Sequence, residues 1–121
     1  MNFLYVALGG GIGAIARYGI SLLLSLHTSA PNWSSTLLVN VIGSLLIGLL
    51  YGNFQRHGLE NSLWSLLLVT GFCGGFTTFS AFSLDLFHAL SEGQYLTAFL
   101  YPLLSIALSF AALALGIIVT K

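Results

Sequence analysis

The chain has 121 residues, of which 57% are hydrophobic and 5% are charged, and its formal net charge is zero. A soluble domain carries about 25% charged residues, and a soluble chain this short has no room to bury so much apolar surface. The composition therefore excludes an ordinary soluble domain, and the scarcity of basic residues excludes a nucleic-acid partner. It indicates a protein embedded in the lipid bilayer.

Four apolar runs are each long enough to cross the membrane, since a helix of about 20 residues covers the hydrocarbon thickness. They predict an all-α membrane protein with one transmembrane domain, residues 1–121, whose spans cover residues 3–26, 35–54, 62–90 and 95–120. The runs lack the alternation of barrel strands and are about twice as long as such strands. With four spans, both chain ends are expected on the same side of the membrane.

The first span combines closely spaced glycines with one cation. Gly9 and Gly13 predict the close approach of a neighbouring helix. Arg17 follows four residues later on the same helix face. Its position leaves three interpretations open: the guanidinium extends to the membrane interface, attracts anions, or anchors the broken segment of the third span.

The second span carries one small and polar face. Small or polar residues recur at every fourth position, namely Thr36, Asn40, Ser44, Gly48 and Gly52. Ser44, Gly48 and Gly52 are interpreted as contacts between helices. The amide of Asn40 needs hydrogen-bond partners inside a membrane, so a bond to another helix and an ion ligand are equally consistent with its position.

The third span contains a sequence that is unusual for a membrane helix. Residues Gly71 to Ser80 hold three glycines, three phenylalanines, two threonines and one serine. We predict a break in the helix here, and broken helices at membrane depth mark ion or substrate sites. Phe76, Phe79 and Phe82 recur every three residues, either as core packing or as ring edges turned towards an anion.

The fourth span carries a ladder of hydroxyl groups. Thr97, Tyr101, Ser105 and Ser109 follow one another at every fourth position, which places donors and acceptors along about 18 Å of one helix face. A single serine in a span often bonds its own helix, but four hydroxyls in a row favour a polar path through the membrane.

The remaining polar groups exclude several functions. Asp85 and His88, near the end of the third span, are expected to be solvated at the interface or to form a local pair. No carboxylate pair, nucleophile with its base, or His and Cys metal cluster is present, so no enzymatic activity is expected. The donors outnumber embedded carboxylates, and this favours an anion or a neutral solute.

The charges give almost no preference for one orientation in the membrane. Arg56 and Lys121 fall on the side of the chain ends, and Arg17 lies towards the other side. Orientation follows the Lys and Arg bias between the two sides. Two copies of such a chain could insert in opposite directions and pair antiparallel.

Three motifs in order resemble a known family. They cover residues 10–18, 36–44 and 71–80, and with them the chain resembles the fluoride channels of the Fluc (CrcB) family over essentially its whole length. The resemblance implies an antiparallel, dual-topology homodimer in the cell inner membrane. It also implies two fluoride pores, each lined by both subunits, that export fluoride passively and lower its toxicity in the cytoplasm.

The resemblance also implies roles for individual residues. Asn40 matches the pore amide, and Phe79 and Phe82 match the aromatic pair that contacts fluoride. The candidates for a polar track along the pore are Thr36, Ser80, Tyr101, Ser105 and Ser109.

The same family holds a structural sodium ion on the two-fold axis of the dimer. The matching positions are Gly74 and Thr77 of both subunits, which would bind the ion through backbone carbonyls. A hard cation prefers oxygen ligands, and a broken helix leaves carbonyls free. Arg17 matches the family arginine and is expected to line the vestibule or to support the structure.

Two other functions are weighed against the channel. A small antiparallel exporter of cationic drugs would have the same size, but it needs an embedded carboxylate where the first span has Arg17. A non-transporting subunit of a membrane assembly would explain the small-residue faces but not the hydroxyl ladder or the phenylalanines.

Overall fold

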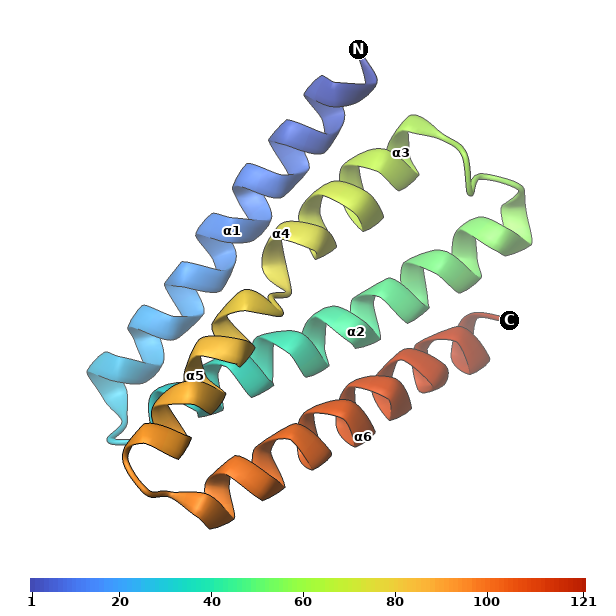
Figure 1. The fold of residues 1–121 in the computed structure, drawn as a ribbon. Helices are drawn as coiled ribbons and strands as arrows, with labels where there is room; N and C mark the ends of the chain where they lie inside the picture. Colours follow the sequence, from blue (N-terminus) through green and yellow to red (C-terminus); the bar gives the residue numbers. More distant parts are fainter.

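A computed structural model describes all residues, 1–121, as helices joined by short connections (Figure 1). The elements in order are α1 (Asn2–His27), α2 (Asn32–His57), α3 (Leu63–Ser65), η1 (Leu66–Cys73), α4 (Gly74–Phe76), α5 (Ser80–Ser91) and α6 (Tyr95–Thr120). Four helical segments are long and apolar enough to cross a membrane, with the third running from α3 to α5. The predicted four membrane helices are therefore confirmed. The second helix begins and ends three residues beyond its predicted bounds.

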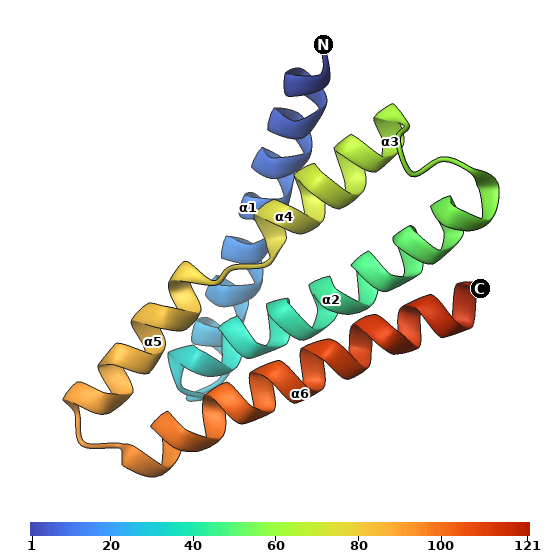
Figure 2. The ribbon, with the colours of Figure 1, turned by 45° about the vertical axis from the view of Figure 1, so that its right-hand side comes forward.

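The helices are arranged as two pairs. α1 lies beside the first half of the third span, and α2 lies beside α6 (Figures 1 and 2). α5 continues the third span and packs against both α2 and α6. Both chain ends lie at the same end of the bundle, as four crossings require (Figure 1).

Glycines bring α1 into backbone contact with the third span. Gly9 and Gly13 are buried, and a Cβ atom on either would collide with the backbone of η1. From the other side, a Cβ atom on Gly75 would collide with the backbone of Gly10. The predicted role of Gly9 and Gly13 in helix packing is confirmed. We call this contact the glycine interface.

Glycines also allow α2 and α6 to pack closely against each other. A Cβ atom on Gly48 would meet the α6 backbone at Leu113, and one on Gly52 would meet the side chain of Thr120. Gly116 on α6 is equally tight against the α2 backbone. The interpretation of Gly48 and Gly52 as packing residues is confirmed.

The break in the third span is confirmed, and it is shorter than the unusual sequence around it. Residues up to Phe76 stay helical, first as the π-helix η1 and then as α4. Thr77 is extended, with φ −85° and ψ 157°, and α5 begins at Ser80. The three glycines therefore do not unwind the helix, because Gly71 and Gly75 pack against α1. The hydroxyl residues that follow them interrupt it.

Candidate functional site

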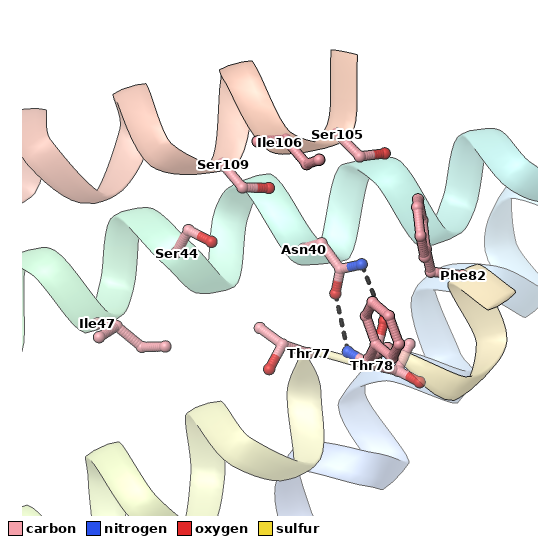
Figure 3. Close-up of a pocket in the computed structure, with 10 residues that line it drawn as sticks. Asn40, Ser44, Ile47, Thr77, Thr78, Phe82, Ser105, Ile106 and Ser109 are labelled. Atoms are coloured by element: carbon pink, nitrogen blue, oxygen red, sulfur yellow. Dashed lines mark hydrogen bonds between the residues drawn. The ribbon is translucent and has the colours of Figure 1, made fainter. Parts of the chain in front are cut away.

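Asn40 holds the broken backbone in place. Its Oδ1 accepts a hydrogen bond from the Thr78 amide at 2.8 Å, and its Nδ2 donates to the Thr78 carbonyl at 3.0 Å (Figure 3). One side chain thus satisfies both backbone groups of a residue that no helix satisfies. The bond between helices that the sequence left open for Asn40 is present. The amide retains a second N–H group without a protein acceptor.

The Thr78 hydroxyl starts the next helix. It accepts a hydrogen bond from the Ala81 amide at 3.1 Å, as an N-cap hydroxyl does. It also lies 3.2 Å from the Ser80 hydroxyl. The Thr77 hydroxyl faces back and donates to the Cys73 carbonyl at 2.9 Å. The two threonines therefore end one helix and begin another within three residues.

A groove of about 320 Å³ lies between the break, α2, α5 and α6 (Figure 3). Its lining residues are Asn40, Ser44, Ile47, Thr77, Thr78, Phe79, Phe82, Ser105, Ile106 and Ser109. Five of the predicted pore residues meet here, namely Asn40, Phe79, Phe82, Ser105 and Ser109. We call this space the groove.

The groove presents hydrogen-bond donors that the protein does not use. The Ser105 hydroxyl oxygen is buried and has no hydrogen-bond partner. Several other hydroxyls at helical positions donate to the carbonyl four residues earlier, as Ser83 does to Phe79 at 3.0 Å and Ser91 to Phe87 at 2.9 Å. A buried hydroxyl without a partner costs free energy, so Ser105 is an exception that packing alone does not explain. No carboxylate or cationic side chain lines the groove.

Phenylalanine rings stand at the end of the groove nearest the break. The ring centroids of Phe79 and Phe82 are 5.5 Å apart, and the Phe82 and Tyr101 centroids are 5.0 Å apart. Phe79 is 78% exposed, although it lies at mid-span. The chain itself therefore leaves most of this ring uncovered.

Three predicted track residues lie outside the groove. Thr36 is buried and lines a different cavity. Ser80 is exposed beside Thr78. Tyr101 is buried against Phe82, and its hydroxyl lies 3.3 Å from the Asp85 carboxylate, to which it donates a hydrogen bond. The hydroxyls of the fourth span thus do not form one continuous line within a single subunit.

Four further residues that line the groove, Ser44, Ile47, Thr78 and Ile106, were not predicted from the sequence. Ser44 was assigned to helix packing, but its side chain lines the groove, so that interpretation was wrong. Its position one turn after Asn40 on the polar face was the available signal. Ile47 and Ile106 carried no signal, since isoleucine is common throughout the spans. Thr78 could have been found as the second hydroxyl of the break motif.

A second cavity, of about 290 Å³, lies between α1 and α2 around Arg17. It is lined by hydroxyl residues of both helices and shares the lining residue Thr78 with the groove. The Arg17 Nε donates to the Gly75 carbonyl at 3.2 Å. Of the three interpretations of Arg17, anchoring of the broken segment matches this bond.

Asp85 and His88 share a small polar hollow with Trp33, Glu92 and Gln94 at the end of α5. Asp85 is bonded to Tyr101, as described above, instead of forming the local pair with His88 that the sequence suggested as one alternative. No group of three or more His, Cys, Asp or Glu residues could hold a metal ion through side chains.

Comparison with known proteins shows full-length relatives. The family described as "CrcB-like protein, Camphor Resistance (CrcB)" matches residues 4–117. A protein of Coxiella burnetii (strain CbuK_Q154) named "Fluoride-specific ion channel FluC" is 43% identical over 122 residues, covering 100% of this chain and 98% of the relative. Proteins of the same name from Pyrococcus abyssi and Flavobacterium psychrophilum are 43% and 39% identical. They cover 98% and 97% of this chain, and 94% of each relative is matched.

Proposed function

This chain belongs to the CrcB family, and we propose that it is a channel that conducts fluoride selectively through the membrane. It is a multi-pass membrane protein and not an enzyme. Conduction is passive, and it carries fluoride out of the cell across the inner membrane, which lowers fluoride toxicity in the cytoplasm. The names of the relatives support fluoride as the ion, and the lining of the groove supports it as the path.

The unpartnered hydroxyl of Ser105 carries this proposal within the structure. Together with the free N–H of Asn40 and the hydroxyls of Ser44 and Ser109, it offers donors to an anion along the groove. Fluoride is a small, hard hydrogen-bond acceptor, so such donors replace part of its water. Because no full positive charge lines the groove, the ion is held weakly enough to leave again.

The rings of Phe79 and Phe82 complete the contact with fluoride. Their edges carry partial positive charge, and turned towards the ion they stabilise it without a formal charge. The candidates outside the groove, Thr36, Ser80 and Tyr101, extend the polar track towards the two membrane faces.

The pore is completed by a second, antiparallel copy of the chain. In a single subunit the groove faces outward, with Phe79 78% and Ile106 68% exposed. Broken backbone and polar groups at membrane depth are tolerated only when protein or a water-filled cavity covers them. The weak charge bias permits both orientations, so the homodimer has dual topology and two pores.

A sodium ion on the dimer axis belongs to the same proposal, and the backbone fits it. In an uninterrupted helix the Gly74 carbonyl would accept from the Thr78 amide. Likewise the Thr77 carbonyl would accept from the Ala81 amide. Those amides instead donate to Asn40 and to the Thr78 hydroxyl. Both carbonyls are therefore open to a hard cation, which would supply positive charge near the fluoride paths.

The function is tested by ion efflux from liposomes that contain the purified chain. We expect fast fluoride release, little chloride release in a matched sample, and no change when a pH gradient is imposed. A proton-coupled exporter would instead respond to the pH gradient. Absence of fluoride release from folded, dimeric protein would contradict the channel.

The dimer is tested at Gly74. A Cβ atom there meets nothing within 4 Å in one subunit, so Gly74→Ala leaves the subunit fold intact. If a second copy packs on this position, the variant loses dimer in detergent, as measured by light scattering. A variant that remains as dimeric as the unmodified chain would contradict the placement of the axis.

A further inference from the structure

Arg17 lies near the middle of a membrane-spanning helix, where a guanidinium is stable only with compensating interactions. Its Cα is about 4 Å from the middle of α1 at 1.5 Å per residue, and its side chain is half-buried. A charged group at this depth is costly and marks function. It does not line the groove, so it does not contact an ion there.

The bond from Arg17 replaces one that the break removes. In a continuous helix the Gly75 carbonyl would accept a hydrogen bond from the amide of Phe79, four residues later. α4 ends at Phe76, and the chain turns away before that amide can reach. The Arg17 Nε donates to this carbonyl at 3.2 Å instead.

Two contacts with α1 hold Gly75 in place. The backbone of Gly10 lies so close that a Cβ atom on Gly75 would collide with it. Arg17, two turns further along α1, bonds the carbonyl of the same residue. The position of α4 relative to α1 therefore depends on both contacts.

The two sides of the break are held by two different helices. α1 holds the end of α4 through Arg17, and α2 holds Thr78 through Asn40. Only three residues, Thr77 to Phe79, separate the two helices of the third span. A shift at Gly75 is therefore transmitted directly to the Thr78 backbone and to the Phe79 ring in the groove.

We propose that Arg17 is a positioning residue for conduction, and that it acts through the N–H of its Nε and not through its charge. It holds the end of α4 so that Thr78 and Phe79 keep their places along the groove. This inference rests on the proposed function, because it concerns how that same path is shaped.

Two substitutions separate the donor from the charge. In glutamine the Nε2 atom is attached to Cδ, as Nε is in arginine, so Arg17→Gln keeps an N–H at that position and loses the charge. In Arg17→Lys a methylene group takes the place of Nε, while the positive charge is kept one atom further out. Arg17→Met, which has neither, serves as the reference for complete loss.

The experiment measures fluoride efflux from liposomes at low and at high fluoride, beside chloride efflux, for all four chains. We expect Arg17→Gln to stay within about threefold of the unmodified chain and Arg17→Lys to fall about tenfold, the effect of one hydrogen bond to a charged group. We also expect the loss in Arg17→Lys to be the same at both fluoride concentrations, since capture of the ion is unchanged.

The opposite order would overturn the inference. If Arg17→Lys conducts normally and Arg17→Gln fails mainly at low fluoride, Arg17 acts by attracting anions. Equal loss in both variants, or no loss in either, also rules out the Nε donor. If the unmodified chain releases no fluoride, the proposed function itself has failed. Size-exclusion chromatography confirms that each variant is folded, and the Gln and Lys pair decides even if Arg17→Met does not fold.

Discussion

The glycine interface and the groove are built from similarly small residues and do opposite things. At the glycine interface, Gly9 and Gly13 remove side chains entirely, so two backbones touch and no space remains. At the groove, Asn40, Ser105 and Ser109 keep short polar side chains, and a hollow of about 320 Å³ remains between the helices.

This difference indicates that the glycine interface supports the fold, whereas the groove is the proposed path of the ion. Backbone contact without side chains is rigid and has no hydrogen-bonding capacity left over, so α1 supports the third span. The groove retains an unpartnered hydroxyl and a free amide N–H, the donors that the proposed anion path requires. Substitutions at the glycine interface should therefore affect folding first, and substitutions in the groove should affect fluoride first.

The largest effect is expected at the glycine interface. In Gly13→Ala the new methyl group collides with the backbone of Phe72, which cannot move as a side chain can. We expect destabilisation by about 1–3 kcal/mol or more, measured as lost yield and an earlier thermal transition in detergent. Gly11→Ala is the control, because a Cβ atom there meets nothing within 4 Å. Equal stability of the two variants would contradict the interface.

In the groove, the strongest effect on fluoride is expected from Asn40→Asp. The new carboxylate still accepts from the Thr78 amide, but it loses the N–H donors and places a negative charge beside an anion. Fluoride efflux should fall about a hundredfold or more, since like charges in contact cost several kcal/mol. Asn53→Asp, the same change at an exposed position near the end of α2, should leave efflux unchanged. An active Asn40→Asp channel would remove Asn40 from the path.

Phe79→Ile removes the aromatic ring and keeps an apolar side chain at this position. Phe79 is 78% exposed in one subunit, so we expect stability to change little, while loss of the ring edge lowers fluoride efflux about tenfold, consistent with an aromatic contribution of about 1 kcal/mol or more. Phe87→Ile, at another exposed ring on α5, is the matched control. If both variants conduct alike, the ring of Phe79 has no special role.

The smallest effect, and the most specific, is expected from Ser105→Ala. Removing a buried hydroxyl that has no partner should leave stability unchanged or raise it, whereas fluoride efflux should fall about three- to tenfold for the lost donor. Ser91→Ala, whose hydroxyl is exposed and bonds its own helix, should change neither. A Ser105→Ala variant that is less stable but conducts normally would make Ser105 a structural residue.

The helices could be predicted from the sequence more fully than the sites where they contact one another. The four spans follow from hydrophobic runs, and the helix contacts of Gly9, Gly13, Gly48 and Gly52 follow from spacing. The break was predicted, but its exact position was not, because the glycines of the motif stay helical and pack against α1 while the threonines after them interrupt the helix. Sequence spacing does not distinguish a glycine that breaks a helix from a glycine that allows two helices to pack closely.

The residues that line the groove could not be predicted from spacing along the sequence alone. Residue spacing put Tyr101, Ser105 and Ser109 on one face of α6, but only the packing of α5 shows that Tyr101 is occupied by Asp85 and Phe82. Ser44 could not be distinguished from Gly48 by spacing, since both are small residues on the same face. What separates them is the partner opposite: α6 backbone for Gly48 and open space for Ser44.

We propose that fluoride passes through the groove, and a thiol placed there tests this path directly. In a Cys73→Ser background, which removes the only cysteine, Ser109→Cys puts a thiol in the groove and Ile118→Cys puts one on the outer face of α6, where Ile118 is 71% exposed. Fluoride efflux is then recorded in chloride-free medium before and after silver ions are added. We expect silver to stop efflux through the Ser109→Cys channel and to leave the Ile118→Cys channel unaffected. Undiminished efflux from Ser109→Cys protein whose thiol has bound silver would contradict it.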